Sequence, residues 1–307
     1  MNQLPIGLVF PGQGTQKKGM GEVWRETPSW NLAEKISEVT GEDLPGLLLD
    51  TPAEQLRRTD LAQLTVFTVA VIAHAEAVRT GALDGPVVAC AGHSLGEYAA
   101  LTAAGAVTVE AGAAIVAARG RAMRRAAEDR EGTMGVLVAA PADAVAALVD
   151  EVRAGGTDVW VANVNAPGQT VVSGSPDGID RIDAAAPSIG AKMIRLQVGG
   201  AFHSPYMAPA AEALRTALKN TAFAPVHMPV VANVDAVPYT GDCDWPELGT
   251  RQLTRPVLWE RCVRTLTATL GCGRLVELGP GRTLAGLIRR IDPDIEVMSV
   301  DAPGVLH

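Results

Sequence analysis

The stretch "VVACAGHSLGEYAALTAAG", residues 87–105, joins an apolar run to a helix-like run through a turn that holds one serine between two glycines. The apolar run is typical of a strand that is covered on both faces of a parallel sheet. The turn Gly92-His93-Ser94-Leu95-Gly96 fits the pattern GxSxG, and between a strand and a helix this pattern is typical of a nucleophile elbow. There the serine backbone is strained, and side chains at the flanking glycines would clash. An incidental serine in a glycine-rich turn is the alternative interpretation.

On both sides of the elbow, short apolar runs alternate with longer runs rich in alanine and leucine. This alternation predicts an α/β fold, in which helices lie between the strands of a mostly parallel sheet. With the elbow, it favours a large domain like that of the α/β hydrolases. We expect strands at residues 6–10, 86–92, 228–234, 274–279 and 295–300.

One segment has a different rhythm. Over residues 130–198 the pattern reads strand, helix, strand, strand, helix, strand, which matches a small ferredoxin-like α+β unit. We interpret this unit, residues 129–198, as a subdomain inserted into a large catalytic domain formed by residues 1–128 and 199–307.

Composition excludes several classes of protein. The chain has 307 residues and a net charge of −8, which argues against a nucleic-acid partner. Neither a signal peptide nor an apolar run of about 18 residues is apparent, so no membrane segment is expected. The cysteines form no CxxC pair and no zinc pattern, which predicts no metal site and reduced thiols in a cytoplasmic protein. These cysteines are Cys90, Cys243, Cys262 and Cys272.

A serine nucleophile needs a base, and five histidines are available. His203 lies in "VGGAFHSPYM", after a strand and before Ser204 and Pro205, which have the residue types of a helix start. That position is a strand-end loop, where active sites of parallel sheets assemble. His227, before a strand, is the main competitor. The others are His74 in a helical run, His93 beside the serine and expected to point away from it, and His307 at the chain end.

Two backbone N–H groups are candidates for an oxyanion hole. One belongs to Leu95, the residue after the serine. The other lies near Gln13 in the glycine turn "LVFPGQGTQKKGMG", which has neither the Walker A pattern nor GxGxxG. A tight turn without further function explains the second stretch equally well.

One arginine is expected to face the protein core. In "EAGAAIVAARGRAMRRAAED", helical spacing places Arg119 on the apolar face with Ile115 and Met123, whereas the neighbouring arginines point elsewhere. A buried arginine needs an anion, which is either an internal acidic side chain or a carboxylate of the substrate.

Seven motifs in this order resemble the malonyl-CoA:acyl carrier protein transacylases, the acyltransferases of fatty-acid and polyketide synthesis. They extend along nearly the whole chain, and they are "FPGQG", "GHSLGEYAAL", "RGRAM", "NVNAPGQTVVSG", "GAFHSPYM", "QLTRPVLW" and "ELGPGRTLAGL". The resemblance implies that Ser94 is the nucleophile and that His203 is its base. It also places Arg119 on the malonyl carboxylate, and Gln13 and Leu95 at the oxyanion.

The resemblance assigns four further residues. It implies that Gln63 lines the acyl pocket, although Leu64 follows where the family usually has proline. It implies that the backbone carbonyl of Gln252 orients the histidine and that Asn165 binds substrate at the subdomain cleft. Phe202 favours malonyl over methylmalonyl by filling the space of an α-methyl group, whereas Gly200 departs from both family patterns.

The resemblance implies a ping-pong transfer from malonyl-CoA, through malonyl-Ser94, to the phosphopantetheine thiol of an acyl carrier protein. It implies no permanently bound cofactor, and we expect a monomer without nucleic-acid or membrane partners. Three alternatives stay open: a thioesterase or esterase of the GxSxG type, an acyltransferase for a larger unit such as methylmalonyl, and an inactive docking subunit of a synthase. The pathway, fatty-acid or polyketide, is not defined by the sequence.

Overall fold

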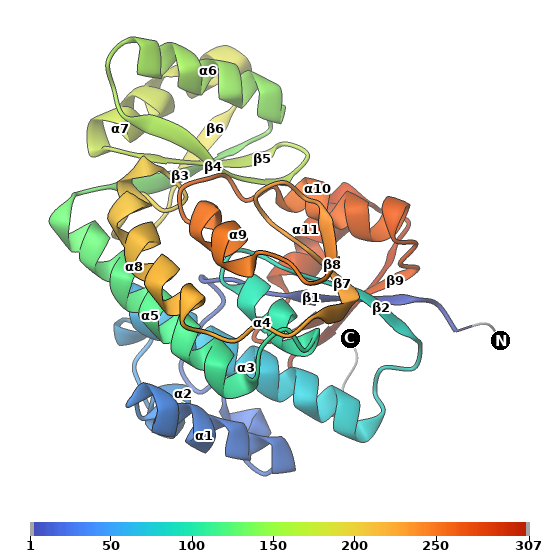
Figure 1. Cartoon of the computed structure of the whole chain (residues 1–307). Coiled ribbons are helices and arrows are strands. Elements are labelled where there is room, and N and C mark those ends of the chain that lie inside the picture. The colour runs from blue at the N-terminus through green and yellow to red at the C-terminus, as the bar shows by residue number, and fades with distance from the viewer. Residues whose placement is uncertain (1–2, 305–307) are drawn as a thin grey trace.

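The computed structural model describes residues 3–304, which form two sheets of unequal size (Figure 1). The larger sheet has the strand order β10-β9-β1-β2-β7-β8. All neighbouring pairs are parallel except the last, in which β8 runs antiparallel to β7. The prediction of a parallel-rich α/β sheet is therefore confirmed. Its strands are Ile6–Phe10 (β1), Val87–Gly92 (β2), Val226–Val231 (β7), Pro238–Gly241 (β8), Arg274–Leu278 (β9) and Glu296–Val300 (β10).

The five expected strands are all present; half of their ten ends are unchanged, and the others move by one to three residues. Strand β8 was not predicted, because four residues that begin with proline carry almost no apolar pattern. Strand β1 is buried along its whole length in the middle of the sheet. Since β1 and β2 are parallel neighbours, their carboxyl ends meet at one edge, where the glycine turn and the elbow lie together.

Helices cover both faces of this sheet, as its apolar strands require. Helix α3 lies in the core, where it packs against α5, and α5 also packs against α8. The helices that accompany the large sheet are Asn31–Thr40 (α1), Leu44–Leu49 (α2), Thr59–Thr80 (α3), Gly96–Ala103 (α4), Val109–Asp129 (α5), Ala208–Lys219 (α8), Trp245–Gln252 (α9), Trp259–Arg264 (α10) and Thr283–Ile291 (α11).

Helix α3 departs from the expectation that no membrane-length apolar segment exists. Within residues 3–304 it is the one helix long and apolar enough to cross a membrane. Most of its side chains, however, are buried inside the protein. Core helices of globular proteins share this composition, and the packing of α3 against α5 accounts for it.

The smaller sheet contains four antiparallel strands in the order β4-β5-β3-β6. Its elements follow the predicted sequence of strand, helix, strand, strand, helix, strand, and Figure 1 shows the unit at the top of the molecule. Helices α6 and α7 bury one face of the sheet in a separate apolar core. The elements are Thr133–Val138 (β3), Ala142–Ala154 (α6), Val159–Ala166 (β4), Gln169–Gly174 (β5), Pro176–Ala185 (α7) and Lys192–Arg195 (β6).

Backbone hydrogen bonds join the two sheets in addition to the covalent connections of the chain. Val257 accepts a backbone hydrogen bond from Val164 of β4 at 2.9 Å and donates one to Ala162 at 2.9 Å. The segment before α10 therefore continues the edge of the small sheet, and α10 packs against β4. This fixes the small sheet above the carboxyl edge of the large one.

Candidate active site

The elbow has the geometry that the GxSxG pattern predicts. Ser94 has φ of 50°, in the left-handed region that residues other than glycine rarely adopt. A Cβ on Gly92 would lie 1.9 Å from the carbonyl carbon of Gly96, and a Cβ on Gly96 would lie 2.1 Å from the oxygen of Phe10. Both glycines are therefore required because backbone occupies the space of a side chain.

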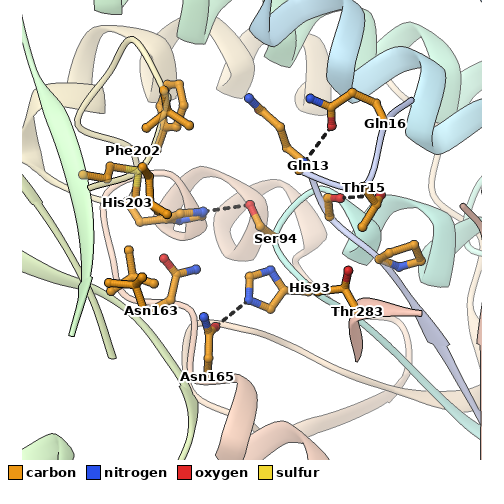
Figure 2. A pocket seen from close by; sticks show the side chains of 18 of the residues that line it. Gln13, Thr15, Gln16, His93, Ser94, Asn163, Asn165, Phe202, His203 and Thr283 are labelled. Atoms are coloured by element: carbon orange, nitrogen blue, oxygen red, sulfur yellow. Dashed lines mark hydrogen bonds between the residues drawn. The ribbon is translucent and has the colours of Figure 1, made fainter. Parts of the chain in front are cut away.

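His203 lies against the serine. Its Nε2 is 2.7 Å from Ser94 Oγ (Figure 2). Its Nδ1 is 2.9 Å from the backbone oxygen of Gln252. With Nδ1–H donating to that carbonyl, Nε2 is left to accept the serine proton. Burial, with a smaller contribution from the nearby Arg119, lowers the pKa of His203 to about 3. The imidazole is therefore neutral near pH 7, as a base must be.

The other histidines lie elsewhere. His227 is exposed in β7, and His74 is inside α3 against Phe10, where burial lowers its pKa to about 4. His93 does not bond the serine hydroxyl, but its ring faces the cavity and its Nε2 lies 2.8 Å from Asn165 Oδ1. His307 lies outside the described residues.

Arg119 is buried, with 1% of its surface exposed, as helical periodicity predicts. Its Nη2 donates to Ser94 Oγ and to Gln252 Oε1 at 3.0 Å each, and its Nη1 donates to Gln63 Oε1 at 2.6 Å. All three acceptors are neutral. Among residues 3–304, no carboxylate forms an ion pair with this guanidinium, and its Nε has no hydrogen-bond partner. This buried cation therefore lies beside a serine hydroxyl with no carboxylate at ion-pair distance, and the carboxylate that acts on it through space is that of the buried Glu97.

Gln63 and Gln252 hold the guanidinium in this position. Gln63 is fully buried behind Arg119 and is not among the residues that line the cavity. Its location thus differs from the lining position that the family resemblance implies, because the amide points at Arg119 and not at the open space. Gln252 also makes two further contacts. Its side-chain amide donates to the backbone oxygen of Ser94 at 3.0 Å, and its backbone carbonyl accepts from His203.

The backbone N–H groups that lack an acceptor within the described part of the chain include the two candidates for the oxyanion hole. These two belong to Gln13, on the glycine turn after β1, and to Leu95, just before α4. The glycine turn and the elbow are in contact, since His93 N donates to Phe10 O at 2.9 Å. Both free donors therefore occupy the carboxyl edge of the central strands, where an oxyanion beside Ser94 would lie.

A cavity of about 560 Å³ opens above Ser94 between the two sheets. The edge of the large sheet contributes Gln13, Ser94 and His203 to its lining. The small sheet contributes a wall that includes Met134, Val136, Asn163, Asn165 and Val171. Phe202, which precedes the histidine, also lines the cavity and is 6% exposed. The only formally charged side chains in the lining are Arg57 and Arg119.

Comparison with known proteins agrees with this geometry. The family model described as "acyl transferase domain" matches residues 8–284. This chain belongs to the acyl transferase domain family. A malonyl CoA-acyl carrier protein transacylase of Bacillus subtilis is 35% identical over 305 residues, which cover 98% of this chain and 95% of the relative. The polyketide biosynthesis transacylase PksC of the same organism is 35% identical over 296 residues, covering 95% and 99%.

Solved acyltransferase structures share the whole fold. The malonyl-CoA:acyl carrier protein transacylase (FabD) of Xanthomonas oryzae superposes with a TM-score of 0.91 at 35% identity, covering 99% of this chain and 96% of that one. A type II PKS acyl-carrier protein in complex with its malonyl-transacylase, PlMCAT:AntF, gives a TM-score of 0.91 at 32% identity, covering 97% and 96%. Identity above 30% over the full length places this acyltransferase with them in family as well as in fold.

Sequence reasoning missed two residues at the elbow of this acyltransferase. Asn233 and Glu97 are both buried, and their side chains bond backbone groups around Ser94. Asn233 follows β7, whose carboxyl end reaches the same sheet edge, and this position was the available signal. Across residues 3–304, no group of three His, Cys, Asp or Glu side chains could hold a metal ion.

Proposed function

We propose that this chain transfers the malonyl group from malonyl-CoA to the phosphopantetheine thiol of an acyl carrier protein, through an acyl-serine intermediate. One observation carries the proposal: Arg119 is buried beside Ser94 Oγ and is bonded only to neutral oxygens. A substrate with a carboxylate near its reacting carbonyl supplies the missing anion, and malonyl-CoA has that chemistry. The names of the similar proteins from Bacillus subtilis and Xanthomonas oryzae support the same substrate and partner.

In the first half-reaction, Ser94 Oγ attacks the thioester carbonyl of malonyl-CoA. His203 Nε2 takes the serine proton, and the carbonyl of Gln252 keeps the imidazole in the required tautomer. The N–H groups of Gln13 and Leu95 stabilise the developing oxyanion. The C–S bond then breaks, and the coenzyme A thiolate leaves with the proton that His203 carried, which yields malonyl-Ser94.

In the second half-reaction, the phosphopantetheine thiol of the carrier protein attacks malonyl-Ser94. His203 now takes the thiol proton and returns it to Ser94 Oγ as the ester bond breaks, which regenerates the free enzyme. Arg119 pairs with the malonyl carboxylate throughout and must release part of its contact with Ser94 and the two glutamines. Acetyl-CoA has no carboxylate, so it is a poor donor.

The segment that precedes His203 sets the choice among carboxylated acyl groups. Phe202 lines the cavity next to His203, where its ring excludes an α-methyl group. A Cβ on Gly200 would lie 2.7 Å from that ring, so glycine at this position lets the ring rest against the backbone. Asn165 and its partner His93 supply polar groups for the thioester arm. The relatives include transacylases of polyketide biosynthesis, so both fatty-acid and polyketide carriers are candidate acceptors.

At the level of the fold, we assign residues 1–128 and 199–307 to an α/β-hydrolase-like domain and residues 129–198 to a ferredoxin-like subdomain. The strand order β4-β5-β3-β6 with two helices on one face supports the second assignment. The protein acts as a monomer in the cytoplasm, where malonyl-CoA and carrier proteins are both present. It needs no permanently bound cofactor, because the serine, the histidine and the arginine supply the chemistry.

Intact-mass spectrometry tests the proposal. The purified chain is mixed with malonyl-CoA, methylmalonyl-CoA or acetyl-CoA, and holo carrier protein is added afterwards. We expect a mass increase of one malonyl group on Ser94 from malonyl-CoA, followed by its transfer to the carrier protein. Acetyl-CoA that acylates Ser94 as fast as malonyl-CoA would contradict the role of Arg119.

The same experiment separates a transferase from a GxSxG hydrolase. Without carrier protein, the release of coenzyme A should stop at one equivalent per enzyme, because water deacylates malonyl-Ser94 slowly. Continuous release at the rate of acylation would assign a thioesterase activity. No acylation of Ser94 by any thioester would support an inactive docking subunit.

A further inference from the structure

Asn233 clamps the backbone of the elbow through two side-chain hydrogen bonds and is not among the residues that line the cavity. The residue follows β7 and is fully buried. Its side-chain oxygen accepts the N–H of Ser94 at 2.6 Å, and its side-chain NH₂ donates to the oxygen of Gly92 at 2.7 Å. An amide that uses both ends in this way has one orientation, because the reversed amide would face the Ser94 N–H with its own donor.

Glu97 holds the clamp in turn. Its Oε2 accepts the backbone N–H of Asn233 at 2.6 Å, and the carboxylate is 2% exposed in the first turn of α4. Ser94 and Glu97 are three residues apart, so the two bonds to Asn233 close a ring around the start of the helix. A carboxylate buried without a directly paired cation is costly, and its use here is to fix the asparagine.

The clamp acts on the strained residue itself. Ser94 has φ of 50°, and such a conformation persists only where the surroundings determine it. Helix α4 begins at Gly96, so the Ser94 N–H lies outside the helix and would otherwise be unpaired. Because Asn233 occupies the Ser94 N–H, the free donor at the elbow is the N–H of Leu95.

We propose that Asn233 is a positioning residue for acyl transfer, held by Glu97, and that it sets the alignment of Ser94 Oγ with His203 and of the Leu95 N–H with the oxyanion. The inference rests on the proposed function for its assay. A displacement of the nucleophile by about 1 Å can reduce a rate about 100-fold, so loss of the clamp affects the chemical step more than binding.

The test measures single-turnover acylation of Ser94 by malonyl-CoA for wild type, Asn233→Ala, Asn233→Asp and Glu97→Gln. We expect Asn233→Ala to lower the acylation rate at saturation about 10- to 100-fold with the half-saturating concentration changed less than about twofold. Asn233→Asp keeps the acceptor for Ser94 N–H, and Glu97→Gln keeps the acceptor for Asn233 N–H. Both variants should therefore acylate Ser94 faster than Asn233→Ala does, although more slowly than wild type.

A matched control separates positioning from stability. Ser29 is a buried residue whose hydroxyl donates to the buried Glu76 at 2.8 Å, on the α3 side of the protein, and it does not line the cavity. Ser29→Ala should lower the melting temperature without changing the acylation rate. A folded Asn233→Ala variant that acylates within twofold of wild type, while wild type itself is active, would overturn the inference and leave the proposed function standing.

A measurement on the wild type avoids variants that fail to fold. Hydrogen exchange followed at the Ser94 amide should show strong protection, comparable to that of the central strands, because its N–H is bonded to a buried oxygen. Exchange of this amide at the rate of an exposed loop would also overturn the inference.

Discussion

The two walls of the cavity are held in different ways. At the edge of the large sheet, each side chain to which the proposed reaction assigns a role is fixed by a buried partner: Ser94 by His203, His203 by Gln252, and Arg119 by two glutamines. The wall from the small sheet combines the apolar Met134, Val136 and Val171 with the amides of Asn163, Asn165 and Gln169, of which Asn165 bonds His93. We infer that the first wall defines the reaction and that the second wall defines how well the acyl arm fits. Substitutions should therefore be severe on one side and mild on the other.

The largest effect is expected at the nucleophile. Ser94→Ala should abolish covalent loading by malonyl-CoA, because the strained backbone presents no other hydroxyl to His203. Intact mass after incubation measures this directly. A variant that still gained one malonyl group at a single site would show that the nucleophile lies elsewhere.

The second-largest effect is expected for Arg119→Ala. Charge-assisted bidentate contacts contribute roughly 1.5–3 kcal/mol, so kcat/KM for malonyl-CoA should fall about ten- to a hundredfold. The rate with acetyl-CoA should change little, which reduces the preference between the two donors. An unchanged ratio of malonyl to acetyl transfer would remove the arginine from substrate recognition.

Asn165→Ala tests the small-sheet wall. The substitution removes one hydrogen bond to His93, worth about 1 kcal/mol, so we expect a loss of roughly fivefold in kcat/KM. Saturation kinetics with malonyl-CoA provide the measurement. A loss in kcat/KM as large as that of Arg119→Ala would contradict the inference that the small-sheet wall affects only the fit of the acyl arm.

Docking of the carrier protein should depend on exposed arginines near α10. Carrier proteins of this type are acidic, whereas this chain also has a net charge of −8, so a local basic surface is needed. Arg255 and Arg261 are exposed, and within residues 3–304 neither forms an ion pair, whereas Arg264 pairs with Glu260 at 2.8 Å. Arg261→Glu should raise the KM for carrier protein several-fold and leave loading from malonyl-CoA intact.

Arg264→Glu serves as the control for this surface, and the effect of Arg261→Glu should diminish as salt rises because exposed charges are screened beyond about 8 Å. Equal transfer rates for Arg261→Glu and wild type at low salt would place the docking surface elsewhere, for example near Arg289.

The smallest effect is expected from a change in pH on the reactivity of Ser94. The pKa of His203 is lowered from 6.5 to about 3, so the folded protein keeps the imidazole unprotonated as pH falls through 6.5. Labelling of Ser94 by a fluorophosphonate should therefore be nearly constant from pH 8 to pH 5. Burial raises the pKa of Glu97 to about 7, so Glu97→Gln is measured in parallel to remove that titration. A rate that falls with a midpoint near 6.5 in both proteins would contradict the lowered pKa.

The parts of the site that the sequence predicts are those with a local signal. Ser94 has its glycines, Arg119 has its helical spacing, and the parallel strands have continuous apolar runs. These signals need only a few consecutive residues, so the parallel-rich sheet and the order of elements in the small unit follow from them.

The remaining features depend on contacts between distant segments. Asn233 meets Ser94 across 139 positions of sequence, and His93 meets Asn165 across 72. No periodicity reports such pairs, which is why the pairing of His93 was not foreseen. Gln63 was placed in the cavity lining by resemblance, yet its amide faces Arg119, because the direction of a side chain depends on its packed neighbours.

A crystal structure of the acyl-enzyme tests the central claim most directly, namely that Arg119 awaits the carboxylate of the substrate. Crystals would be soaked with malonyl-CoA in the absence of carrier protein. We predict a malonyl ester on Ser94 Oγ whose two carboxylate oxygens each lie about 2.8 Å from the guanidinium of Arg119, with the hydrogen bond to Gln63 lengthened or lost. A malonyl carboxylate that points to solvent while Arg119 keeps its contacts with Gln63 and Gln252 would contradict the account.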